Sequence, residues 1–512
     1  MNKKLILASI IIFFTNMVFS QAPAIQWQKS LGGSGKDVAL NIERTSDGGY
    51  ITAGYSDSND GDVTENRGFL DFWIVKSDSN GNVQWQKTLG GSGSETAHSI
   101  KQTLDSGYIV LGRSASNDGD VSGNHGSEDF WIVKLNANGN IQWQKSLGGI
   151  SVDSAFDLDL TSDGGYILKG ESSSNSGDVT GNHGSVDFWV LKLDSIGNIQ
   201  WQKSLGGSLF ESAYSIQQTS DSGYILAGGS RSNDGDVTGN HGSFDFWIVK
   251  LNNNGSIEWQ KSLGGSGIDI ASNIKETSDG GYIVAGYSNS NDGDVTGNRG
   301  GFDYWIVKLD NNGIIQWQKS LGGSNDDYAA NIQQTLDGKY IVVGSSLSND
   351  GDVSGHHGDS ENNDAWIVRL NSSGDILWEK SLGGSKDDLI FTISQTLDGG
   401  YILAGNSGSN DGDVTENNGD SDLWIVKLAP DNLNINETAF KNLVFVENPV
   451  KDILKMQSQE KIKSLQLYTA DGKLIETSNS QNMSVKELPK GMYILRIQLE
   501  NGPVVSEKII KE

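Results

Sequence analysis

The chain has 512 residues, with 66 Gly and only 5 Pro but 14 Trp, 14 Tyr and 15 Phe, which indicates many tight turns around a packed core rather than a disordered chain. It has no Cys, which excludes disulfide frameworks, cysteine zinc sites and cysteine nucleophiles. The net charge of −27 argues against nucleic acid or an anionic membrane as a partner and allows cation binding.

Residues 1–20 have the layout of a secretory signal peptide. Lys3 and Lys4 form a basic start, Leu5–Phe14 is an apolar run, and a cleavage position follows at Ser20. A membrane anchor is the alternative, but the apolar run is short for a span of ~20 residues. We therefore predict an exported protein with no membrane span in the mature chain.

One unit is repeated seven times between residues 21 and 428. The 14 Trp mark the repeat, because they form two sets of seven at a spacing of 58 residues, with one spacing of 61 in each set. Three extra residues in the sixth unit, around Asp359–Asn363, account for the longer spacing. The first set is Trp27, Trp85, Trp143, Trp201, Trp259, Trp317 and Trp378, and the second is Trp73, Trp131, Trp189, Trp247, Trp305, Trp366 and Trp424.

Each unit contains four segments with the pattern of short strands, and no window shows a helical period. Examples are Ile141–Gly149 (segment a), Ala213–Asp221 (b), Gly223–Ser230 (c) and Asp245–Asn252 (d). Four short strands in each of seven repeats are the signature of a β-propeller. The predicted fold class is all-β, with a seven-bladed β-propeller over residues 21–428 and a small C-terminal β-sandwich.

The hydrophobic pattern orders the strands within a blade. Segments c and d are apolar at successive positions, as in strands covered on both faces, whereas segment a alternates and carries a Lys that suits an exposed edge. Segment b carries an Ala twelve residues after the first Trp in six units, and small residues suit a crowded inner strand. The predicted order from the axis outward is b, c, d, a.

The repeat region begins with a segment a, Ile25–Gly33, and ends with a segment d, Asp422–Leu428, so the seventh blade lacks its own outer strand. We predict that Gln26–Leu31 pairs with Leu423–Leu428 and that this N-terminal strand closes the ring. An open solenoid is the alternative, and it would leave two bare strand edges.

The amino-acid sequence of the repeat resembles repeats of secreted bacterial proteins. A GYIxxG segment followed by a Trp-containing strand is similar to kelch-type blades, and DFWIVKL followed by IQWQKSLGGS is similar to propeller repeats of secreted Bacteroidetes proteins. The resemblance covers residues 21–428. It implies the propeller fold but no particular activity, because propellers host many functions.

Carboxylates recur at four positions of the repeat, and three of these positions belong to the long c–d loop. Clustered carboxylates beside a Gly turn suit Ca²⁺. Asx turns, in which these side chains bond backbone N–H groups, are the alternative, and both interpretations are open. The candidate calcium ligands are Asp60, Asp62, Asp71, Asp118, Asp120, Asp129, Asp234, Asp236 and Asp245.

The fourth recurring acid lies ten residues after each first Trp, as in Asp37 and Glu95. We expect it to bond backbone at the start of the inner strand; a ring of negative charge around the central channel is the alternative. The six His are expected to be surface turn residues. No acid/base or nucleophile set is recognisable, so we predict no catalytic residue and no cofactor other than calcium.

The composition changes after Leu428. Residues 429–440 are predicted to form a linker and residues 441–512 a β-sandwich with Asp-Gly and Asn-Gly turns. This last segment resembles the type IX secretion C-terminal sorting domain of Bacteroidetes, and an ordinary appended β-sandwich is the alternative. The residues that carry the resemblance are Asn448, Pro449, Asp471, Gly472, Leu488, Gly491, Tyr493 and Lys508.

That resemblance implies passage through the periplasm, recognition by the type IX translocon and release or attachment at the outer cell surface. The main functional hypothesis is a non-enzymatic propeller that binds a glycan or another surface ligand, with several equivalent sites. A polysaccharide hydrolase or lyase acting near the axis, and a purely structural or adhesion protein, are the alternatives. An enzyme needs a pocket of residues unique to single blades, whereas a multivalent binder has equivalent grooves on all seven.

Overall fold

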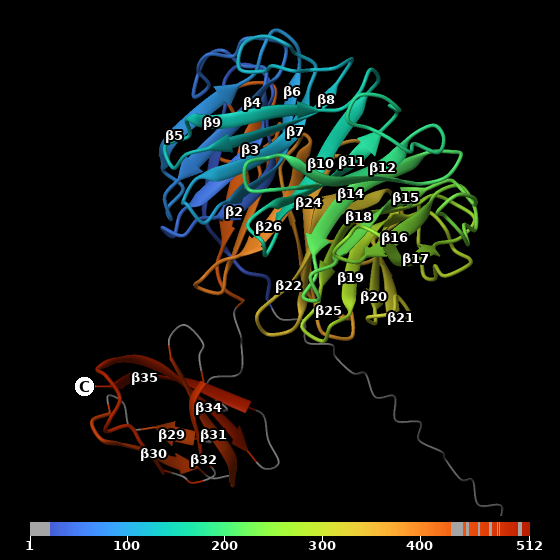
Figure 1. Ribbon diagram of the computed structural model, residues 1–512. Coiled ribbons are helices and arrows are strands. Elements are labelled where there is room, and N and C mark those ends of the chain that lie inside the picture. Colours follow the sequence, from blue (N-terminus) through green and yellow to red (C-terminus); the bar gives the residue numbers. More distant parts are fainter. Residues whose placement is uncertain are drawn as a thin grey trace, which may run out of the picture. The chain divides into compact units, whose positions relative to one another are not determined.

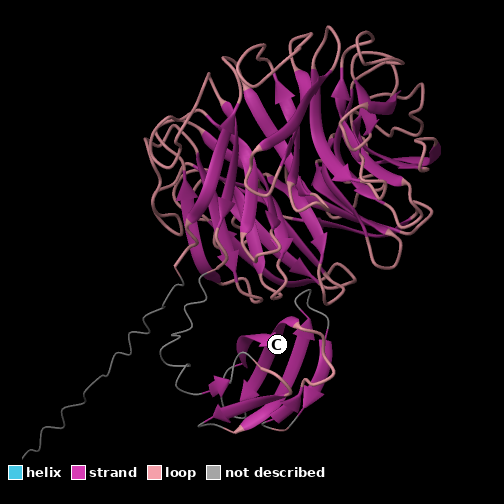
Figure 2. Ribbon diagram, turned by 90° about the vertical axis from the view of Figure 1, so that its left-hand side faces the viewer, coloured by secondary structure: helices cyan, strands magenta, loops and turns pink. Residues whose placement is uncertain are grey.

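The computed structural model describes residues 21–431 and, nearer the C-terminus, residues 444–446, 450–458, 461–469, 474–478, 480, 482–499 and 504–511. The predicted signal peptide, residues 1–20, lies outside the described residues. The chain divides into two units, Met1–Asp431 and Asn432–Glu512. The described parts contain strands and turns but no helix (Figure 2). Accordingly, they hold no helix of the length and apolarity that a bilayer span requires.

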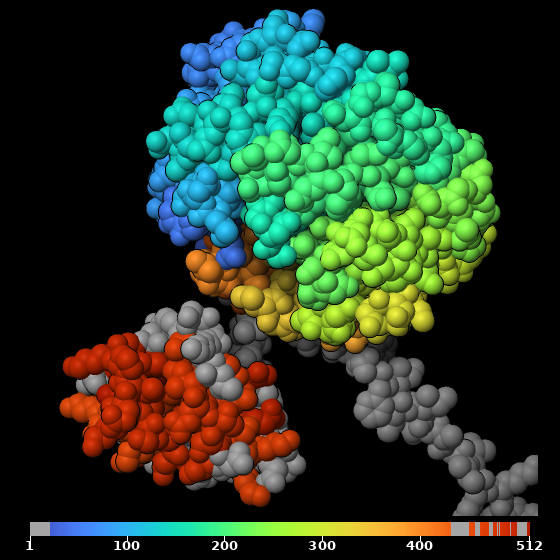
Figure 3. Space-filling view, viewed as in Figure 1, coloured from blue at the N-terminus to red at the C-terminus, as the bar shows by residue number. Residues whose placement is uncertain are grey.

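The first unit consists of seven four-stranded antiparallel sheets, and each sheet is one blade (Figure 1). The order within each is the predicted b, c, d, a, and Figure 3 shows the blades following one another in chain order. The first three blades are β2 (Asp37–Arg44), β3 (Tyr50–Ser56), β4 (Asp71–Ser77), β5 (Val83–Leu89); β6 (Glu95–Gln102), β7 (Tyr108–Ser114), β8 (Asp129–Leu135), β9 (Ile141–Leu147); and β10 (Asp153–Leu160), β11 (Tyr166–Ser172), β12 (Asp187–Leu193), β13 (Ile199–Leu205).

The next three blades follow the same plan, and the seventh takes its fourth strand from the N-terminus. They are β14 (Glu211–Gln218), β15 (Tyr224–Ser230), β16 (Asp245–Leu251), β17 (Ile257–Leu263); β18 (Asp269–Glu276), β19 (Tyr282–Ser288), β20 (Asp303–Leu309), β21 (Ile315–Leu321); β22 (Asp327–Gln334), β23 (Tyr340–Ser346), β24 (Asp364–Leu370), β25 (Ile376–Leu382); and β26 (Asp388–Gln395), β27 (Tyr401–Ser407), β28 (Asp422–Leu428) with β1 (Ile25–Leu31).

The predicted pairing of the N-terminal strand with the last repeat is confirmed. Strand β1 runs antiparallel to β28, with Leu31 opposite Leu423. The Trp424 indole N–H donates to Gln28 Oε1 at 2.9 Å. In every other blade the second Trp donates to the residue at the same position of its own outer strand, which is a Gln or, in blade 6, Glu379. Blades 1 and 7 also share a hydrophobic cluster that includes Ala39 and Ile425.

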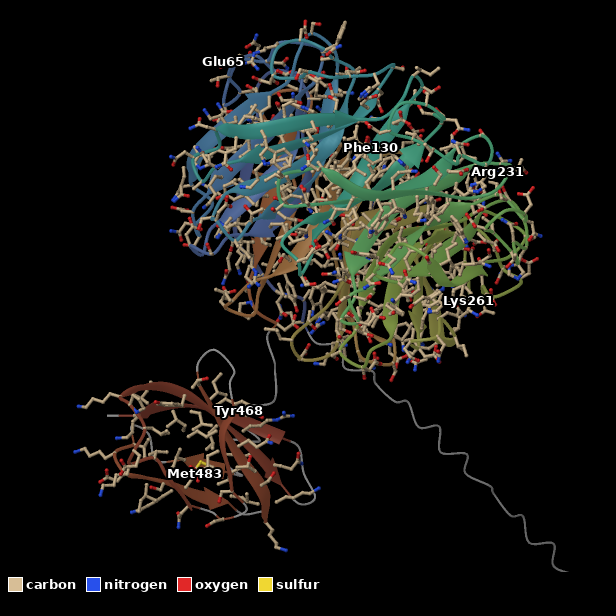
Figure 4. All side chains as sticks on the ribbon, in the orientation of Figure 1. Glu65, Phe130, Arg231, Lys261, Tyr468 and Met483 are labelled. Carbon is tan, nitrogen blue, oxygen red and sulfur yellow. The ribbon has the colours of Figure 1, made fainter. Side chains whose placement is uncertain are left out.

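Packing between neighbouring blades explains the apolar runs of segments c and d. The second Trp of each repeat is almost completely buried. In five repeats it lies against an aromatic ring of the preceding blade, as in Phe130 with Trp189, whose ring centroids are 4.7 Å apart. Figure 4 shows Phe130 among the strands, whereas Arg231 and Lys261 lie at the surface. Each blade packs against a neighbour on both of its faces, so strands c and d are covered on both sides and their side chains are mostly apolar.

The predicted linker begins later than expected. Residues 429–431 belong with the propeller, because the Ala429 N–H donates to Ala24 O at 2.9 Å and Asp431 accepts from the Trp378 indole at 2.9 Å and the Tyr401 hydroxyl at 2.9 Å. Through Asp431 these bonds connect blade 6 with blade 7 at the point where the chain leaves the repeat region. Residues 432–440 lie outside the described residues.

The second unit has two sheets, of order β29-β30-β33 and β32-β31-β34-β35. They share one core that contains Leu454 and Met483 from the first sheet and Leu465 and Leu495 from the second, as expected for a β-sandwich. The sequence analysis did not predict β30 and β33. The strands are β29 (Val444–Val446), β30 (Ile453–Ser458), β31 (Ile462–Thr469), β32 (Leu474–Ser478), β33 (Asn482–Ser484), β34 (Gly491–Leu499) and β35 (Val504–Lys511).

Candidate functional site

The acid that follows each LGG bonds backbone, as expected. Asp37 Oδ2 accepts from the Gly33 N–H at 2.7 Å and from the Ser58 hydroxyl at 2.8 Å, while its Oδ1 accepts from Ser56. Glu95 makes the corresponding bonds in the second blade. The carboxylates are fully buried at the start of the inner strand, so they do not form a charged ring around the axis.

The c–d loop acids also bond backbone N–H groups. Asp60 Oδ1 accepts from the Ser34 N–H at 2.7 Å, Asp62 Oδ2 from Gly32 at 3.2 Å and Asp71 Oδ2 from Arg67 at 2.9 Å. The same three bonds recur in blades 2 and 4, which carry the other candidate calcium ligands. The acceptors there are Asp118, Asp120, Asp129, Asp234, Asp236 and Asp245. The loop therefore ties its own blade to the LGG turn of the preceding repeat.

Over the part of the chain that the structure describes, no three acidic or histidine side chains converge closely enough to hold a metal ion. Calcium binding by the c–d loops stays a prediction. It is tested by comparing the melting temperature of the mature protein in millimolar CaCl₂ and in EDTA, because an ion that binds the folded state must raise it.

A pair of buried carboxyl groups faces one glycine at each blade boundary. In the fifth and sixth blades the pair is Asp303 and Asp327, and a Cβ added at Gly322 would lie 2.9 Å from Asp303 Oδ1 and 2.4 Å from Asp327 Oδ2. This crowding explains why glycine recurs there. Within residues 21–431, one oxygen of the first carboxyl has no hydrogen-bond partner in any of the seven pairs, namely Oδ1 of Asp71, Asp129, Asp187, Asp245, Asp303, Asp364 and Asp422.

Burial raises the pKa of Asp303 to about 7, and the nearby charge of Asp327 adds to the rise. Burial likewise raises the pKa of Asp327 to about 6. A carboxyl group whose pKa is higher in the folded than in the unfolded chain, where it is ~3.9, stabilises the fold while it is protonated. That contribution is complete below pH ~4 and is lost as the pH rises through 6 to 7, so the pairs weaken the propeller at neutral pH.

Replacement of Asp303 by Asn is therefore expected to stabilise the protein, and more at pH 7.5 than at pH 5. The amide removes the buried charge and keeps an oxygen for the Arg299 N–H, which lies 2.9 Å from Asp303 Oδ2. The free energies of unfolding, measured by urea titration, should show a gain that is larger at pH 7.5 by on the order of 2 kcal/mol. Equal gains at both pH values would contradict this account of the pair.

Asp279→Asn is the matched control with the opposite sign. Burial opposes the shift, but hydrogen bonds from Thr277 and Gly281 and the Lys308 charge lower the pKa of Asp279 to about 2. Its contribution is present above the unfolded pKa of ~3.9 and is lost as the pH falls through about 2. This variant should therefore lose stability at pH 7.5 and approach the wild type in acid.

Four of the histidines are more than surface turn residues. His125 Nδ1 lies 2.7 Å from Asp129 Oδ2, and the pairs His183–Asp187, His241–Asp245 and His357–Asp364 are equivalent, at 2.7, 2.6 and 2.8 Å. Each imidazole is partly exposed, while its carboxylate is buried. In three pairs the His lies four residues before the Asp of the DFW segment, which is the sequence signal that could have indicated them; the insertion in the sixth unit makes the spacing seven for His357.

The inner strands surround an axial pocket of about 550 Å³. Each inner strand has a β-bulge after its third residue, for example between Ala155 and Asp157, and the bulged fourth residue lines the pocket. Strands β10, β14 and β18 of this inner set are labelled near the middle of Figure 1. The seven bulged residues are Leu40, His98, Phe156, Tyr214, Ser272, Ala330 and Phe391.

The lining of the axial pocket differs from blade to blade. His98, Phe156 and Tyr214 form an aromatic arc, with ring centroids 5.1 Å apart for the first pair and 5.6 Å for the second. The next two blades contribute the small Ser272 and Ala330 at the same position. Burial lowers the pKa of His98 to about 3, so this imidazole is neutral at physiological pH.

A second aromatic group closes the side of the pocket near blades 5 and 6. Tyr287 and Tyr328 both line the pocket, with ring centroids 5.0 Å apart, and Phe302 packs on both, at 5.5 and 5.4 Å. The Tyr328 hydroxyl donates to Asp326 Oδ2 at 3.1 Å. No counterpart of this three-ring group recurs at the other described blade boundaries.

Polar groups complete the lining. Glu43 forms an ion pair with Lys101, and Asp157 Oδ2 accepts from the Ile216 N–H at 2.9 Å, so both carboxylates are engaged. Asn331, Gln217, Gln333 and Lys275 also line the pocket. This site was not predicted from the sequence, because its residues differ from one repeat to the next. The signal available was the variation at the position directly after the recurring Ala of segment b.

Comparison with known families bears on the C-terminal unit. Residues 448–512 match the family described as secretion system C-terminal sorting domain. This segment is therefore a type IX secretion sorting domain, and the protein is exported to the cell surface or released. In the described part, Leu488 packs on the core and the Tyr493 hydroxyl donates to Pro489 O at 2.8 Å. Asn448, Pro449, Asp471, Gly472 and the side chain of Lys508 lie outside the described residues.

Solved β-propellers are similar to the repeat region at low identity. BamB from Moraxella catarrhalis is 12% identical, with a TM-score of 0.38, covering 79% of this chain and 99% of that chain. The Pan2 WD40 domain of Neurospora crassa is 10% identical, with a TM-score of 0.42, covering 79% and 96%. No curated protein matches the chain. The likeness to kelch blades stays a prediction.

Proposed function

We propose that the mature protein is a non-enzymatic binding protein of the cell surface or the medium, and that its propeller holds a glycan in the axial pocket. The observation that carries the proposal is the lining of that pocket. The recurring acids and the second Trp of the repeat stabilise the fold, since the acids bond backbone and the Trp is buried. The pocket is instead built from residues that single blades contribute.

The chemistry of the lining favours a saccharide. Sugars combine an apolar C–H face, which packs on aromatic rings, with hydroxyls that bond amides and charged groups. The arc of His98, Phe156 and Tyr214 offers the rings, and Gln217 and Asn331 offer the amides. Binding pockets in general combine aromatic walls with a few placed polar groups. A pocket of about 550 Å³ suits a short oligosaccharide rather than a single small ion.

This proposal places one ligand on the axis rather than several in equivalent grooves. A pocket of blade-specific residues is also what the hydrolase or lyase alternative requires. Hydrolysis of a glycoside needs two carboxyl groups free to act as acid and base or nucleophile. The two carboxylates in the lining, Glu43 and Asp157, are held by Lys101 and by backbone, which supports binding over hydrolysis.

A glycan array probed with the fluorescently labelled mature chain, residues 21–512, tests the proposal. We expect a small set of structurally related glycans to be bound, and the heat-denatured chain to bind none. Overnight incubation of a bound glycan with the protein, followed by chromatography, should return it intact. A chain that binds no glycan would overturn the proposal in favour of a structural role, and cleavage would favour the hydrolase.

A further inference from the structure

A second groove lies at the seam, which we define as the boundary between the seventh blade (β26–β28 with β1) and blade 1 (β2–β5). Its volume is about 840 Å³. Its walls include the Trp27 and Tyr50 rings, Arg44, Leu397 and the pair of Asp398 and Lys427. No residue of the groove lines the axial pocket, so the two cavities are separate.

The other blade boundaries show what is normally at this place. The last residue of an inner strand accepts from an N–H in the b–c turn of the preceding blade. Gln102 Oε1 accepts from the Ser46 N–H at 2.7 Å, and the equivalent acceptors are Gln218, Glu276, Gln334 and Gln395, at 2.8, 2.8, 2.8 and 3.0 Å. At the boundary of blades 2 and 3 the residue is Leu160, which packs on the core instead.

At the seam the acceptor is replaced by a donor. Arg44 occupies the place of the glutamine, and the turn N–H belongs to Leu397. A guanidinium has five N–H donors and no acceptor. Within residues 21–431, neither the Arg44 guanidinium nor the Leu397 N–H has a hydrogen-bond partner. Two donors without a partner therefore line the groove, whose one carboxylate, Asp398, is bonded to Lys427.

An anionic oxygen pair is the complement of this arrangement. A carboxylate takes a bidentate bond from Arg, which is the geometry that a guanidinium fits best, and its second oxygen can accept from a backbone N–H. The positive charge of Arg44 has no paired carboxylate of its own, whereas Lys427 is bonded to Asp398 at 3.1 Å. The local charge of the groove thus favours an anion although the chain as a whole is acidic.

The aromatic wall specifies what the carboxylate is attached to. The Trp27 ring is half-buried and lies 6.0 Å, centroid to centroid, from the Tyr50 ring at 58°. The indole lines the groove, where it can pack on the C–H face of a pyranose. We propose that the seam binds an acidic saccharide, with a uronate carboxylate on Arg44 and the Leu397 N–H and the sugar ring on Trp27. This site is additional to the one proposed on the axis.

Titration calorimetry of the mature chain with trigalacturonate tests the inference. We expect saturable binding, with galactotriose, its neutral counterpart, at least tenfold weaker. Arg44→Gln restores the glutamine of the other boundaries, so it should cap the Leu397 N–H, weaken trigalacturonate binding at least tenfold and melt at or above the wild-type temperature. That last readout separates loss of the site from loss of the fold.

Three results would overturn the inference. They are unchanged affinity of Arg44→Gln for trigalacturonate, equal affinity for galactotriose, and sodium sulfate binding as tightly as trigalacturonate, which would mean a site for free anions only. Tyr214→Ser, which alters the axial pocket alone, should leave trigalacturonate binding unchanged. Binding of trigalacturonate at the seam can therefore be confirmed even if no glycan binds in the axial pocket. Likewise, loss of the seam site leaves glycan binding on the axis to be judged by itself.

Discussion

A chain that begins at Ser34 instead of Gln21, and so lacks β1, is expected to melt more than about 10 °C below the chain of residues 21–512 or to aggregate. The deletion removes the antiparallel ladder between β1 and β28 and the bond from the Trp424 indole to Gln28. It also leaves the edge of β28 unpaired, next to the buried Leu423 and Ile425. Differential scanning calorimetry and light scattering after size exclusion measure both effects.

A deletion at the other end is the control. A chain that stops at Asp431 keeps all four strands of the seventh blade and loses only the second unit, so its propeller transition should not move. If the chain without β1 melted within about 3 °C of the wild type as a monomer, the N-terminal strand would not be part of the seventh blade.

Gly228→Ala is expected to destabilise the protein by about 3–5 kcal/mol, a large effect for one methyl group. An added Cβ would lie 2.0 Å from Ser212 O and 2.7 Å from Phe188 Cζ. The first of these atoms is backbone of the inner strand, at the bulge that turns Tyr214 toward the axis. Neither strand can withdraw without breaking the ladder or the contact between blades. Urea unfolding of the variant measures the loss.

The neighbouring glycine supplies a matched control. At Gly229 an added Cβ would meet the side-chain atoms Phe244 Cδ1 and Ile270 Cγ1, at 3.2 and 3.3 Å, and the backbone atom Asp245 O at an ordinary contact distance of 3.8 Å. Other blades carry large residues at this position, such as Arg113 and Tyr287. Gly229→Ala should therefore cost less than ~1 kcal/mol. Similar losses for the two variants would show that close approach at the bulge is not the cause.

The architecture was predictable because the same pattern of four strands occurs seven times in the sequence. Trp spacing gave the repeat length, and the contrast between alternating segment a and continuous segments c and d gave the strand order. The mismatch between a first segment a and a last segment d gave the pairing of β1 with β28. Periodicity of this kind reports packing that every blade shares, so errors at one repeat are corrected by the others.

The candidate sites were not predictable in the same way, because they depend on single blades. Nothing in the sequence marks the bulge that turns Phe156 and Tyr214 into the axial pocket, since a bulge depends on the pairing of two strands. Lys169 is a further example. It stands where other blades have Ala, Leu or Val, yet it is fully buried, with its ammonium 4.0 Å from the centre of the Phe188 ring. Burial lowers the pKa of this lysine well below its usual range.

Arg44 shows the same limit at the seam. Its exchange for Gln is visible in the sequence only after the structure has shown that Gln102 and its equivalents cap a turn of the neighbouring blade. Residues that recur therefore build the propeller and part of the groove wall at the seam, and residues that break the recurrence, such as Phe156 and Arg44, distinguish the candidate sites. This division is the central claim about function.

The most direct test of that claim is a titration of the glycan selected on the array against a variant whose axial pocket lacks the aromatic arc. His98→Ser, Phe156→Ser and Tyr214→Ser together give blades 2 to 4 the small residue that blade 5 already has in Ser272. We predict a melting temperature close to the wild type and binding at least tenfold weaker, while Lys203→Ser on the outer strand β13 leaves binding unchanged. Full affinity in this triple variant would contradict the claim and place the ligand elsewhere on the propeller.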